Sequence, residues 1–494
     1  MVKPDNEDWE RFGRASKTAS PYIQEIYAWR ESPKSFDVAS YYGQIQIHRA
    51  HTVMLAEENI ITNEEAYKII TGIKKIEKQA ETDPKLVTYM STETALIKEI
   101  GEIGGKMHIG RSRNDLGHSQ RRIFYRDQLN RLIGAVIEFR KKLTATASSH
   151  LDVVMPGYTH WRQAQPITLA HYIMAHVEAA GRTVERLEGI YSRTNLSPMG
   201  SAAFAGTGWS VNRLRVMELL GFDKLVENTH DAVAAIDYYM ELSAAISIHM
   251  SNLSRLAEDF QVWSSDEFKL IELDEAFAGT SSIMPQKKNP LILEQVKSYS
   301  AEAIGATVST MVSMKGVSYT NTVDRVMLEP VIIDTAVGSS FVMAGVVETI
   351  IPIRENMMKR LSEGFSTMTD LADTLVRLYG ISFRQAHDII VQVTLESLRN
   401  GILAENITSE MIEKASTEIV GKALKIPEES LQEALNPVLN VNRRNGIGMP
   451  APESVRVMIQ GQRDKVNDEE LRHNIRLDKL KRAKDKLVEA EKML

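Results

Sequence analysis

The feature that most constrains this chain is a long run without helix breakers, from Asn114 to Leu151. Gly117 and Gly134 are its only glycines, and it contains no proline. Its apolar residues recur at the three- and four-residue spacing of a helix, so the run predicts a helix much longer than those of most globular domains. The residues that set this period are Ile123, Leu129, Leu132, Ile133, Val136 and Ile137.

Other long segments show the same helical period. Apolar residues occur on more than one face of these segments, and such helices must be buried by neighbours, including neighbours from other subunits. Several helices of this kind without convincing alternating strands predict an all-α bundle rather than an α/β fold, and they favour an oligomer. The segments are Tyr41 to Lys78, with a break and a helix cap at Asn63, Thr168 to Asn195, Asp231 to Phe260, Leu291 to Met314, and Glu329 to Arg360.

Composition is that of a soluble globular protein. The 494 residues are 43% hydrophobic and 25% charged, and the net charge of −6 offers no basic face for nucleic acid or a membrane surface. The most apolar long stretch, Val331 to Ile353, is interrupted by polar and acidic residues, which favours a core helix over a membrane span. Because Met1 to Trp9 is polar and acidic, without a secretory pattern, we expect a cytoplasmic protein.

The residues that are absent narrow the chemistry. The chain has no cysteine, which excludes disulfides, thiolate catalysis and cysteine-ligated metal sites. It also lacks a P-loop, a G-x-G-x-x-G pattern and an H-E-x-x-H pattern. We therefore expect neither a cofactor nor a metal.

Shifts in composition predict three domains. Residues 1–112 form an N-terminal helical domain, residues 113–363 the central long-helix bundle, and residues 364–494 a C-terminal helical domain with shorter helices. The charged stretch from Asp464 to Leu494 favours a solvated helical face over a partner-binding tail.

Three polar clusters are candidates for a site. The loop from Gly279 to Pro290 combines small residues, two adjacent hydroxyls, two lysines and an amide, so it can bind an anion and move as a lid. The cluster from Gly110 to His118 precedes the longest predicted helix, where Arg113 can bind a carboxylate through two hydrogen bonds. In the cluster from Pro156 to Pro166, His160 is a candidate proton carrier. Taken singly, a solvated connector, a capping turn and a structural histidine explain the three clusters better.

Together the clusters carry a resemblance to a known family. Ser281-Ser-Ile-Met-Pro-Gln-Lys-Lys-Asn-Pro290 resembles the signature loop of the fumarase/aspartase superfamily, in the form of its argininosuccinate lyase branch. The stretch from Gly105 to Asp115 is similar to the first signature of that branch, and Thr159-His160 to the second. The likeness continues in the expected order through Asp370 to Asp373, Phe383 to His387 and Gly446 to Pro452, so it covers most of the chain.

The resemblance implies a mainly α-helical subunit of three domains. In this family four such subunits form a homotetramer around a 20-helix bundle, and each active site takes one cluster from each of three subunits. The implied reaction needs no cofactor. It eliminates fumarate from an N-substituted aspartate and releases an amine.

The resemblance also implies roles for individual residues. Ser281 is the general base, and Lys287 stabilises its anion. His160 protonates the leaving amine or orders water, and Glu294 pairs with it and raises its pKa. The residues implied to hold the succinyl carboxylates are Ser112, Arg113, Asn114, Thr159, Ser282, Lys287 and Asn289.

The amine side of the predicted site departs from argininosuccinate lyases. Leu291 stands where an aspartate is usual, Leu86 to Tyr89 replaces an acidic segment, and Thr320, Arg325 and Leu328 replace a tyrosine, a glutamine and a lysine. Asp37 matches an amine-side acidic position. Fewer acidic groups and the added Arg325 fit a guanidinium poorly, so we predict an aminopolycarboxylate substrate such as ethylenediamine-N,N'-disuccinate.

Two alternatives remain at this stage. The first is an argininosuccinate lyase that produces arginine and fumarate. The second is a crystallin-like structural protein, since the family includes such proteins. Retention of Ser281, Lys287, Asn289, His160 and Glu294 together argues against a purely structural role.

Overall fold

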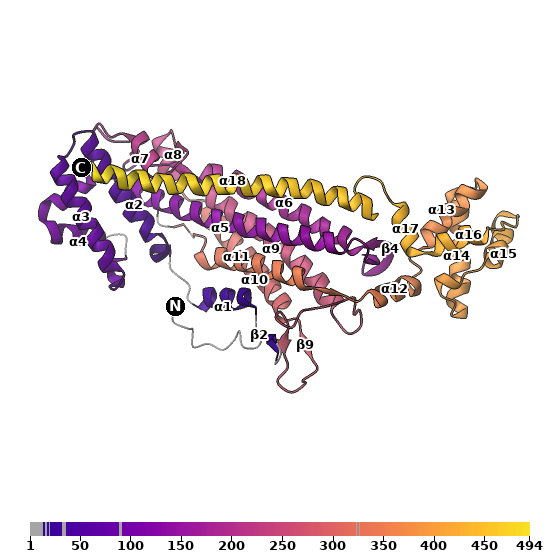
Figure 1. Ribbon diagram of the computed structural model, residues 1–494. Helices are drawn as coiled ribbons and strands as arrows, with labels where there is room; N and C mark the ends of the chain where they lie inside the picture. Colours follow the sequence, from indigo (N-terminus) through magenta and orange to yellow (C-terminus); the bar gives the residue numbers. More distant parts are fainter. Residues whose placement is uncertain are drawn as a thin grey trace.

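The computed structural model describes residues 13–14, 17–18, 20–31, 36–87, 91–322, 324–325 and 327–494. Within these ranges the chain is mainly helical, which confirms the predicted all-α class. Figure 1 shows an elongated molecule, with long helices in the middle and a group of shorter helices at each end.

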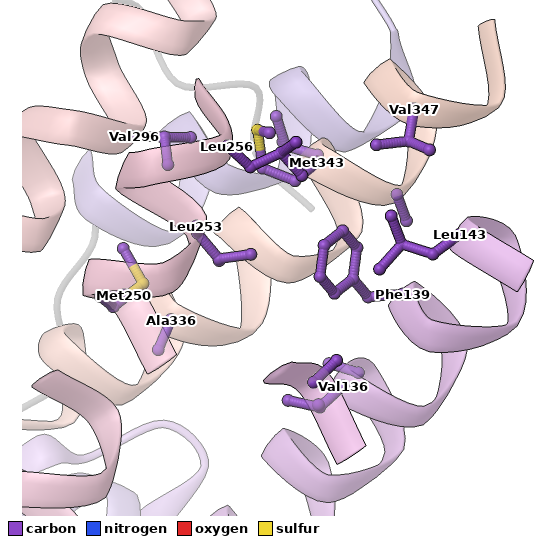
Figure 2. Close-up of a cluster of buried hydrophobic side chains, with 14 of the residues drawn as sticks. Val136, Phe139, Leu143, Met250, Leu253, Leu256, Val296, Ala336, Met343 and Val347 are labelled. Carbon is purple, nitrogen blue, oxygen red and sulfur yellow. The ribbon is translucent and has the colours of Figure 1, made fainter. Parts of the chain in front are cut away.

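Five long helices form the central bundle, and their buried side chains build one hydrophobic core. In Figure 2, Phe139 and Leu143 lie together with Leu253, Leu256 and Met343 from two neighbouring helices. Burying a side chain of this size contributes about 1.5–3 kcal/mol, so this core fixes where the helix ends lie. The helices are α5 (Arg113–Ser149), α6 (Leu169–Thr194), α9 (Asp237–Trp263), α10 (Leu291–Met314) and α11 (Pro330–Thr349).

Most of the predicted helices are confirmed, and two are divided. The segment Asp231 to Phe260 contains α8 (Thr229–Ala234) and α9, because Ala235 between them is extended. The segment Glu329 to Arg360 contains α11, β10 (Ile351–Pro352) and α12 (Arg354–Glu363). Here the residue before Pro352 is biased away from the helical conformation, and both β10 residues pair with β7 (Ile271–Glu272).

Helix α11 is the one described helix that is long and apolar enough to cross a membrane. However, 78% of its most apolar window is buried inside the structure. Its neighbours are other helices of the bundle, and it belongs to the main hydrophobic core. The predicted core helix is therefore confirmed.

The N-terminal group of helices builds a second hydrophobic core, to which α5, α7 (Arg213–Leu219) and α18 (Pro452–Lys492) also contribute residues. The predicted cap at Asn63 is wrong, because Thr62 caps α3 and forms a capping box with Glu65. The elements are α1 (Pro21–Glu31), which lies against α11, α2 (Phe36–Glu57), α3 (Asn63–Ala80), α4 (Ser91–Ile100) and the 3₁₀ helices η2 (Pro84–Leu86) and η3 (Gly101–His108).

The C-terminal group forms a third core at the opposite end of the molecule. Its elements are α13 (Met368–Tyr379), α14 (Phe383–Asn400), η4 (Ala404–Asn406), α15 (Ser409–Val420), α16 (Glu428–Leu435) and α17 (Pro437–Arg443). The predicted division at residues 112 and 363 stays a prediction, because residues on both sides of these bounds share the main core and the N-terminal core.

The last helix, α18 (Pro452–Lys492), is the longest described helix and returns along the whole bundle (Figure 1). Shorter helices were predicted in this part of the chain. A buried ion pair between Arg140 of α5 and Glu469 fixes α18 to the bundle, and Gln462 also accepts a hydrogen bond from Arg140. Its other charged residues are mostly exposed, as predicted from the charge pattern.

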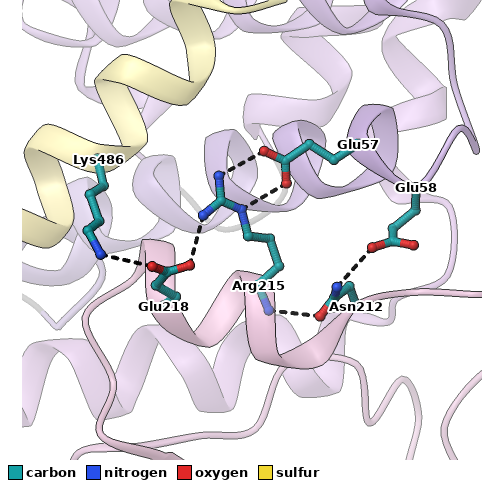
Figure 3. A network of polar contacts seen from close by, with 6 residues as sticks. All are labelled: Glu57, Glu58, Asn212, Arg215, Glu218 and Lys486. Atoms are coloured by element: carbon teal, nitrogen blue, oxygen red, sulfur yellow. Dashed lines mark hydrogen bonds and ion pairs between the residues drawn. The ribbon is translucent and has the colours of Figure 1, made fainter.

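Figure 3 shows how α7 (Arg213–Leu219) joins helices that are distant in sequence. Arg215 donates two hydrogen bonds of 2.8 Å to Glu57 of α2 and one of 2.8 Å to Glu218. Glu218 also accepts a hydrogen bond of 2.9 Å from Lys486 of α18. This network fixes α7 and the loop before it close to the N-terminal end of α5.

The described strands form five short pairs. The β5–β6 pair is parallel, and the other four are antiparallel. Two of the antiparallel pairs, β3–β4 and β8–β9, carry predicted site residues. The strands besides β7 and β10 are β1 (Gly13–Arg14), β2 (Lys17–Thr18), β3 (Val154–Thr159), β4 (Arg162–Thr168), β5 (Leu196–Ser197), β6 (Lys224–Leu225), β8 (Gly279–Thr280) and β9 (Lys288–Asn289).

Candidate active site

The first predicted cluster lies at the N-terminus of α5. Ser112 is the N-cap residue, and its hydroxyl accepts a hydrogen bond of 3.3 Å from the backbone N–H of Asn114. Arg113 begins the helix and is exposed. The positive end of the helix dipole and the Arg113 guanidinium therefore favour an anion at this place.

Asp115, which the sequence analysis did not assign, organises this cluster. It is wholly buried, and each carboxylate oxygen accepts two backbone hydrogen bonds. Oδ1 accepts from Ser112 at 2.9 Å and Leu116 at 3.0 Å, and Oδ2 accepts from Gly200 at 3.1 Å and Ala202 at 2.9 Å. Burial raises the pKa of Asp115 to about 6 although the backbone donors oppose this. Asp115 thus joins the cap of α5 to the loop around Gly200.

The segment before α11 completes this end of the site. Asn321 donates a hydrogen bond of 2.7 Å to the side-chain oxygen of Asn114, whose own amide donates to the carbonyl of Ala203 at 3.0 Å. Arg325 lies next to it, with Nη1 3.4 Å from Nε2 of His118, and it also donates to the carbonyl of Thr320. The structure therefore brings Arg325 to the Asn114 cluster, as an amine-side residue requires.

Two other amine-side positions are placed differently. Leu328 is buried in the main core, so its side chain is not available to a substrate. Asp37 lies in α2, but its side chain is outside the described part of the chain, as are Thr88 and Tyr89. Sequence reasoning missed Asn321, because a single amide in an irregular segment gives no pattern.

The second cluster is at the tip of the β3–β4 hairpin. Thr159 and Arg162 are paired, and the two residues between them, His160 and Trp161, have φ values of 52° and 58°. Two left-handed residues in succession are what a tight type I′ hairpin turn requires, and they are uncommon for residues other than glycine, asparagine and aspartate. Both Thr159 and His160 are exposed, so the hairpin presents them outward.

Residues of the C-terminal part hold the base of this hairpin. Arg444 donates to the carbonyl of Pro166 at 3.2 Å and forms an ion pair with Asp370. His171 lies 3.1 Å from the carbonyl of Gly448. The side chain of Gln163 lies close against Gly364, where an added Cβ would overlap its amide. The family-like residues of the last domain therefore support the second cluster.

The third cluster is the loop between β8 and β9. Gly279 pairs with Asn289 and Thr280 with Lys288, which makes residues 281–287 the tip of a hairpin that projects from the bundle (Figure 1). Ser281 Oγ accepts a hydrogen bond of 3.0 Å from the backbone N–H of Met284. Ser282 and Lys287 are exposed, and Lys288 forms an ion pair with Glu272.

The predicted pair of His160 and Glu294 is not formed within one chain. Glu294 lies in the first turn of α10, where its Oε1 accepts a hydrogen bond of 3.3 Å from Gln261 of α9. No hydrogen bond or ion pair between His160 and Glu294 occurs in the described part of the chain. The loop with Ser281 likewise makes no such contact with the Ser112 cluster.

Helix α5 separates the first and second clusters within one chain. Its 37 residues, at about 1.5 Å each, span roughly 55 Å. Ser112 caps one end, and Thr159 follows shortly after the other. A small substrate cannot contact both clusters of the same chain, so a site that uses both needs more than one subunit.

Comparisons with known proteins agree with this arrangement. A family model described as Lyase matches residues 14–305, and one described as Argininosuccinate lyase C-terminal matches residues 365–442. The argininosuccinate lyase of Methanosarcina acetivorans is 40% identical over 441 residues, which are 87% of this chain and 88% of that protein.

Solved structures of EDDS lyase, an enzyme named for ethylenediamine-disuccinate, have the same fold. The complex with formate gives a TM-score of 0.96 at 42% identity, and a variant with bound fumarate gives 0.95 at 42%. Each comparison covers 98% of both chains.

The fold and these relatives define a carbon–nitrogen lyase that releases fumarate from an N-substituted aspartate. The chain belongs to the argininosuccinate lyase branch of the fumarase/aspartase superfamily.

Proposed function

We propose that this lyase cleaves an aminopolycarboxylate such as ethylenediamine-N,N'-disuccinate into fumarate and a carboxylated amine. The proposal rests on the position of Arg325. This residue contacts His118, one turn after Asn114, and Asn321 of the same segment donates to Asn114 itself. A guanidinium there attracts a carboxylate on the amine and repels the guanidinium of argininosuccinate. The identity of 42% with EDDS lyase over 98% of each chain also supports the proposal.

Leu291 argues against a cationic leaving group. It packs directly against Gly279, because a Cβ added at that glycine would lie 2.3 Å from Leu291 Cδ1. An aspartate at this position would give the loop a negative charge close to Asn289. The leucine leaves this side apolar, so it offers nothing to a cationic leaving group.

We propose the following chemistry. Ser281 removes the proton from the carbon next to one carboxylate, which leaves a second negative charge on that carboxylate. The backbone N–H of Met284 already donates to Ser281 Oγ and would stabilise its anion, with Lys287 adding a positive charge on the closed loop. The adjacent C–N bond then breaks, and His160, paired with Glu294, delivers a proton to the amine nitrogen.

The other predicted residues hold the substrate. We propose that Ser282, Lys287 and Asn289 from the loop and Thr159 from the hairpin bind the succinyl carboxylates. We propose that Ser112, Arg113 and Asn114 of the α5 cluster bind the same carboxylates, and that Arg325 and Asp37 bind the amine. The place of these residues at the N-terminus of α5 supports the assignment of Ser112, Arg113 and Asn114, because the positive end of the helix dipole favours an anion there.

We propose a cytoplasmic homotetramer of three-domain subunits, with each site shared by three subunits. Helix α10 supports the tetramer, because its outward face carries an exposed apolar row, Ile304, Val308, Met311 and Val312. These residues recur at three- and four-residue intervals along one helix face, which identifies a helix-packing surface. The roughly 55 Å length of α5 supports shared sites for the reason given above.

The reverse reaction tests the amine side. Fumarate is offered with N-(2-aminoethyl)aspartate, with unsubstituted ethylenediamine or with arginine, and its consumption is followed. We expect kcat/KM to be about 10- to 100-fold higher with aminoethylaspartate than with either other amine, the size of one or two charge-assisted hydrogen bonds. A preference for arginine would instead indicate an argininosuccinate lyase, which is the name of the relative at 40% identity.

A further inference from the structure

We propose that Arg121 acts together with Arg325 as a two-arginine site for the carboxylates of the leaving amine. The inference rests on the proposed function, because it names the residues that would recognise a carboxylated amine. It adds Arg121, a residue that no sequence pattern assigned. The ligand it fits is an amine that carries a second aspartyl unit.

The geometry comes from one face of α5. Asn114, His118 and Arg121 are four and three residues apart, so they follow one another along the same side of the helix. Arg325 contacts this side through His118, with 3.4 Å between Nη1 and Nε2. Arg121 lies seven residues beyond Asn114, about 10 Å along the helix axis. This distance matches the length of a substrate that is held at Asn114 by one end and extends toward Arg121 and Arg325 with the other.

The two arginines lack anionic partners. Within the described part of the chain, Arg121 is half-buried and makes no hydrogen bond or ion pair. Arg325 donates to Thr320, but its Nε is buried without a partner, and no carboxylate lies within ion-pair distance of its guanidinium among the described residues. Its neighbour Asp324 is exposed.

Neighbouring arginines on α5 show the contrast. Arg122 donates to the carbonyls of Arg193 and Thr194 and lies 4.3 Å from the centre of the Tyr238 ring. Arg126 donates to Asn195 at 3.2 Å and to the carbonyl of Leu220 at 2.9 Å. Both guanidinium groups donate hydrogen bonds within the fold, although Nε of Arg122 is buried without a partner. Arg121 makes no such hydrogen bond among the described residues, so its guanidinium is free to bind a ligand.

The charges around His118 also indicate an anionic ligand. His118 is wholly buried, and burial together with Arg121, Arg325 and Arg122 holds its pKa well below the usual range. The ring is therefore neutral and accepts from Arg325. Burial and the nearby positive charge of Arg121 also lower the pKa of Arg325. Two half-buried positive charges side by side are unfavourable without an anion, and a dicarboxylate neutralises both.

The test measures inhibition by the amine product, N-(2-aminoethyl)aspartate, against whichever substrate the enzyme cleaves. Arg121→Met should raise its inhibition constant about 10- to 100-fold, the loss expected for a charge-assisted hydrogen bond. Arg121→Lys should restore part of the affinity. Inhibition by ethylenediamine, which lacks carboxylates, and by fumarate should stay unchanged, as should the thermal unfolding midpoint.

Two further variants sharpen the result. Arg472→Met removes an exposed arginine of α18 that has no polar partner among the described residues, and it should change none of these constants. The double variant Arg121→Met/Arg325→Met should lose less than the product of the two single losses, because both arginines act on one ligand.

The outcomes separate this inference from the proposed function. An unchanged inhibition constant for aminoethylaspartate in Arg121→Met, with the wild type cleaving ethylenediamine-disuccinate, overturns the two-arginine site alone. A wild type that cleaves only argininosuccinate overturns the proposed substrate. If the same wild type binds aminoethylaspartate no more tightly than ethylenediamine, both the proposed substrate and the two-arginine site are wrong.

Discussion

Replacing Ser281 with alanine should lower kcat for fumarate release by about 10²- to 10⁴-fold, the contribution of a well-placed general base. The substitution removes the oxygen that would take the proton and leaves the rest of the loop in place. Within the described residues, the hydroxyl accepts one hydrogen bond, from the backbone N–H of Met284. The loop is exposed, so the free energy of unfolding should change by less than about 0.5 kcal/mol.

Steady-state rates over a range of substrate concentrations, up to saturation, measure this effect as kcat and KM. Ser282→Ala is the matched control, since it removes the adjacent hydroxyl on the same exposed loop. It should raise KM more than it lowers kcat, because Ser282 is proposed to bind a carboxylate rather than to move a proton. If Ser281→Ala keeps the wild-type kcat, Ser281 is not the base and the proposed chemistry is wrong.

Mixing two inactive variants should restore activity. Ser281→Ala disables the loop cluster, and Arg113→Ala disables the α5 cluster, so each homotetramer should be nearly inactive. If every site takes these clusters from different subunits, random hybrids contain about a quarter of sites with both clusters intact. The two variants are unfolded together, refolded at equal amounts and assayed, with each variant refolded alone as the control.

Recovery to roughly a quarter of the wild-type rate would support sites shared between subunits. The absence of any recovery, in hybrids shown by mass to contain both variants, would mean that both clusters of a site come from one chain. Recovery is the expected result, because within the described residues the Ser281 loop makes no hydrogen bond or ion pair with the Ser112 cluster of its own chain.

The periodic parts of the fold were predictable from the sequence. Helix α10 has the predicted bounds, and α5 and α6 differ from the predictions by two residues or fewer at each end, since their apolar periods are unbroken. The division of Asp231 to Phe260 was not predictable by periodicity, because Ala235 and Ile236 continue an apolar pattern while the backbone turns. The length of α18 was also missed, since its buried residues are few and widely spaced.

The site was predictable only where short motifs carry it. The three clusters were found, and their resemblance named the reaction, because each is a compact run of unusual residues. Asp115 and Asn321 act through backbone contacts and an amide pair between distant segments, which leave no local pattern. In the sequence Arg121 is an ordinary helix residue. Only the structure shows that it lies near Arg325 and has no partner among the described residues.

The most direct test of the proposed substrate is fumarate release by the purified protein from (S,S)-ethylenediamine-disuccinate and from argininosuccinate, measured side by side as kcat/KM. The place of Arg325 and the apolar Leu291 predict that the aminopolycarboxylate is preferred, by about 10-fold or more. Equal or faster cleavage of argininosuccinate would contradict this account of the amine pocket, while leaving a fumarate-releasing carbon–nitrogen lyase.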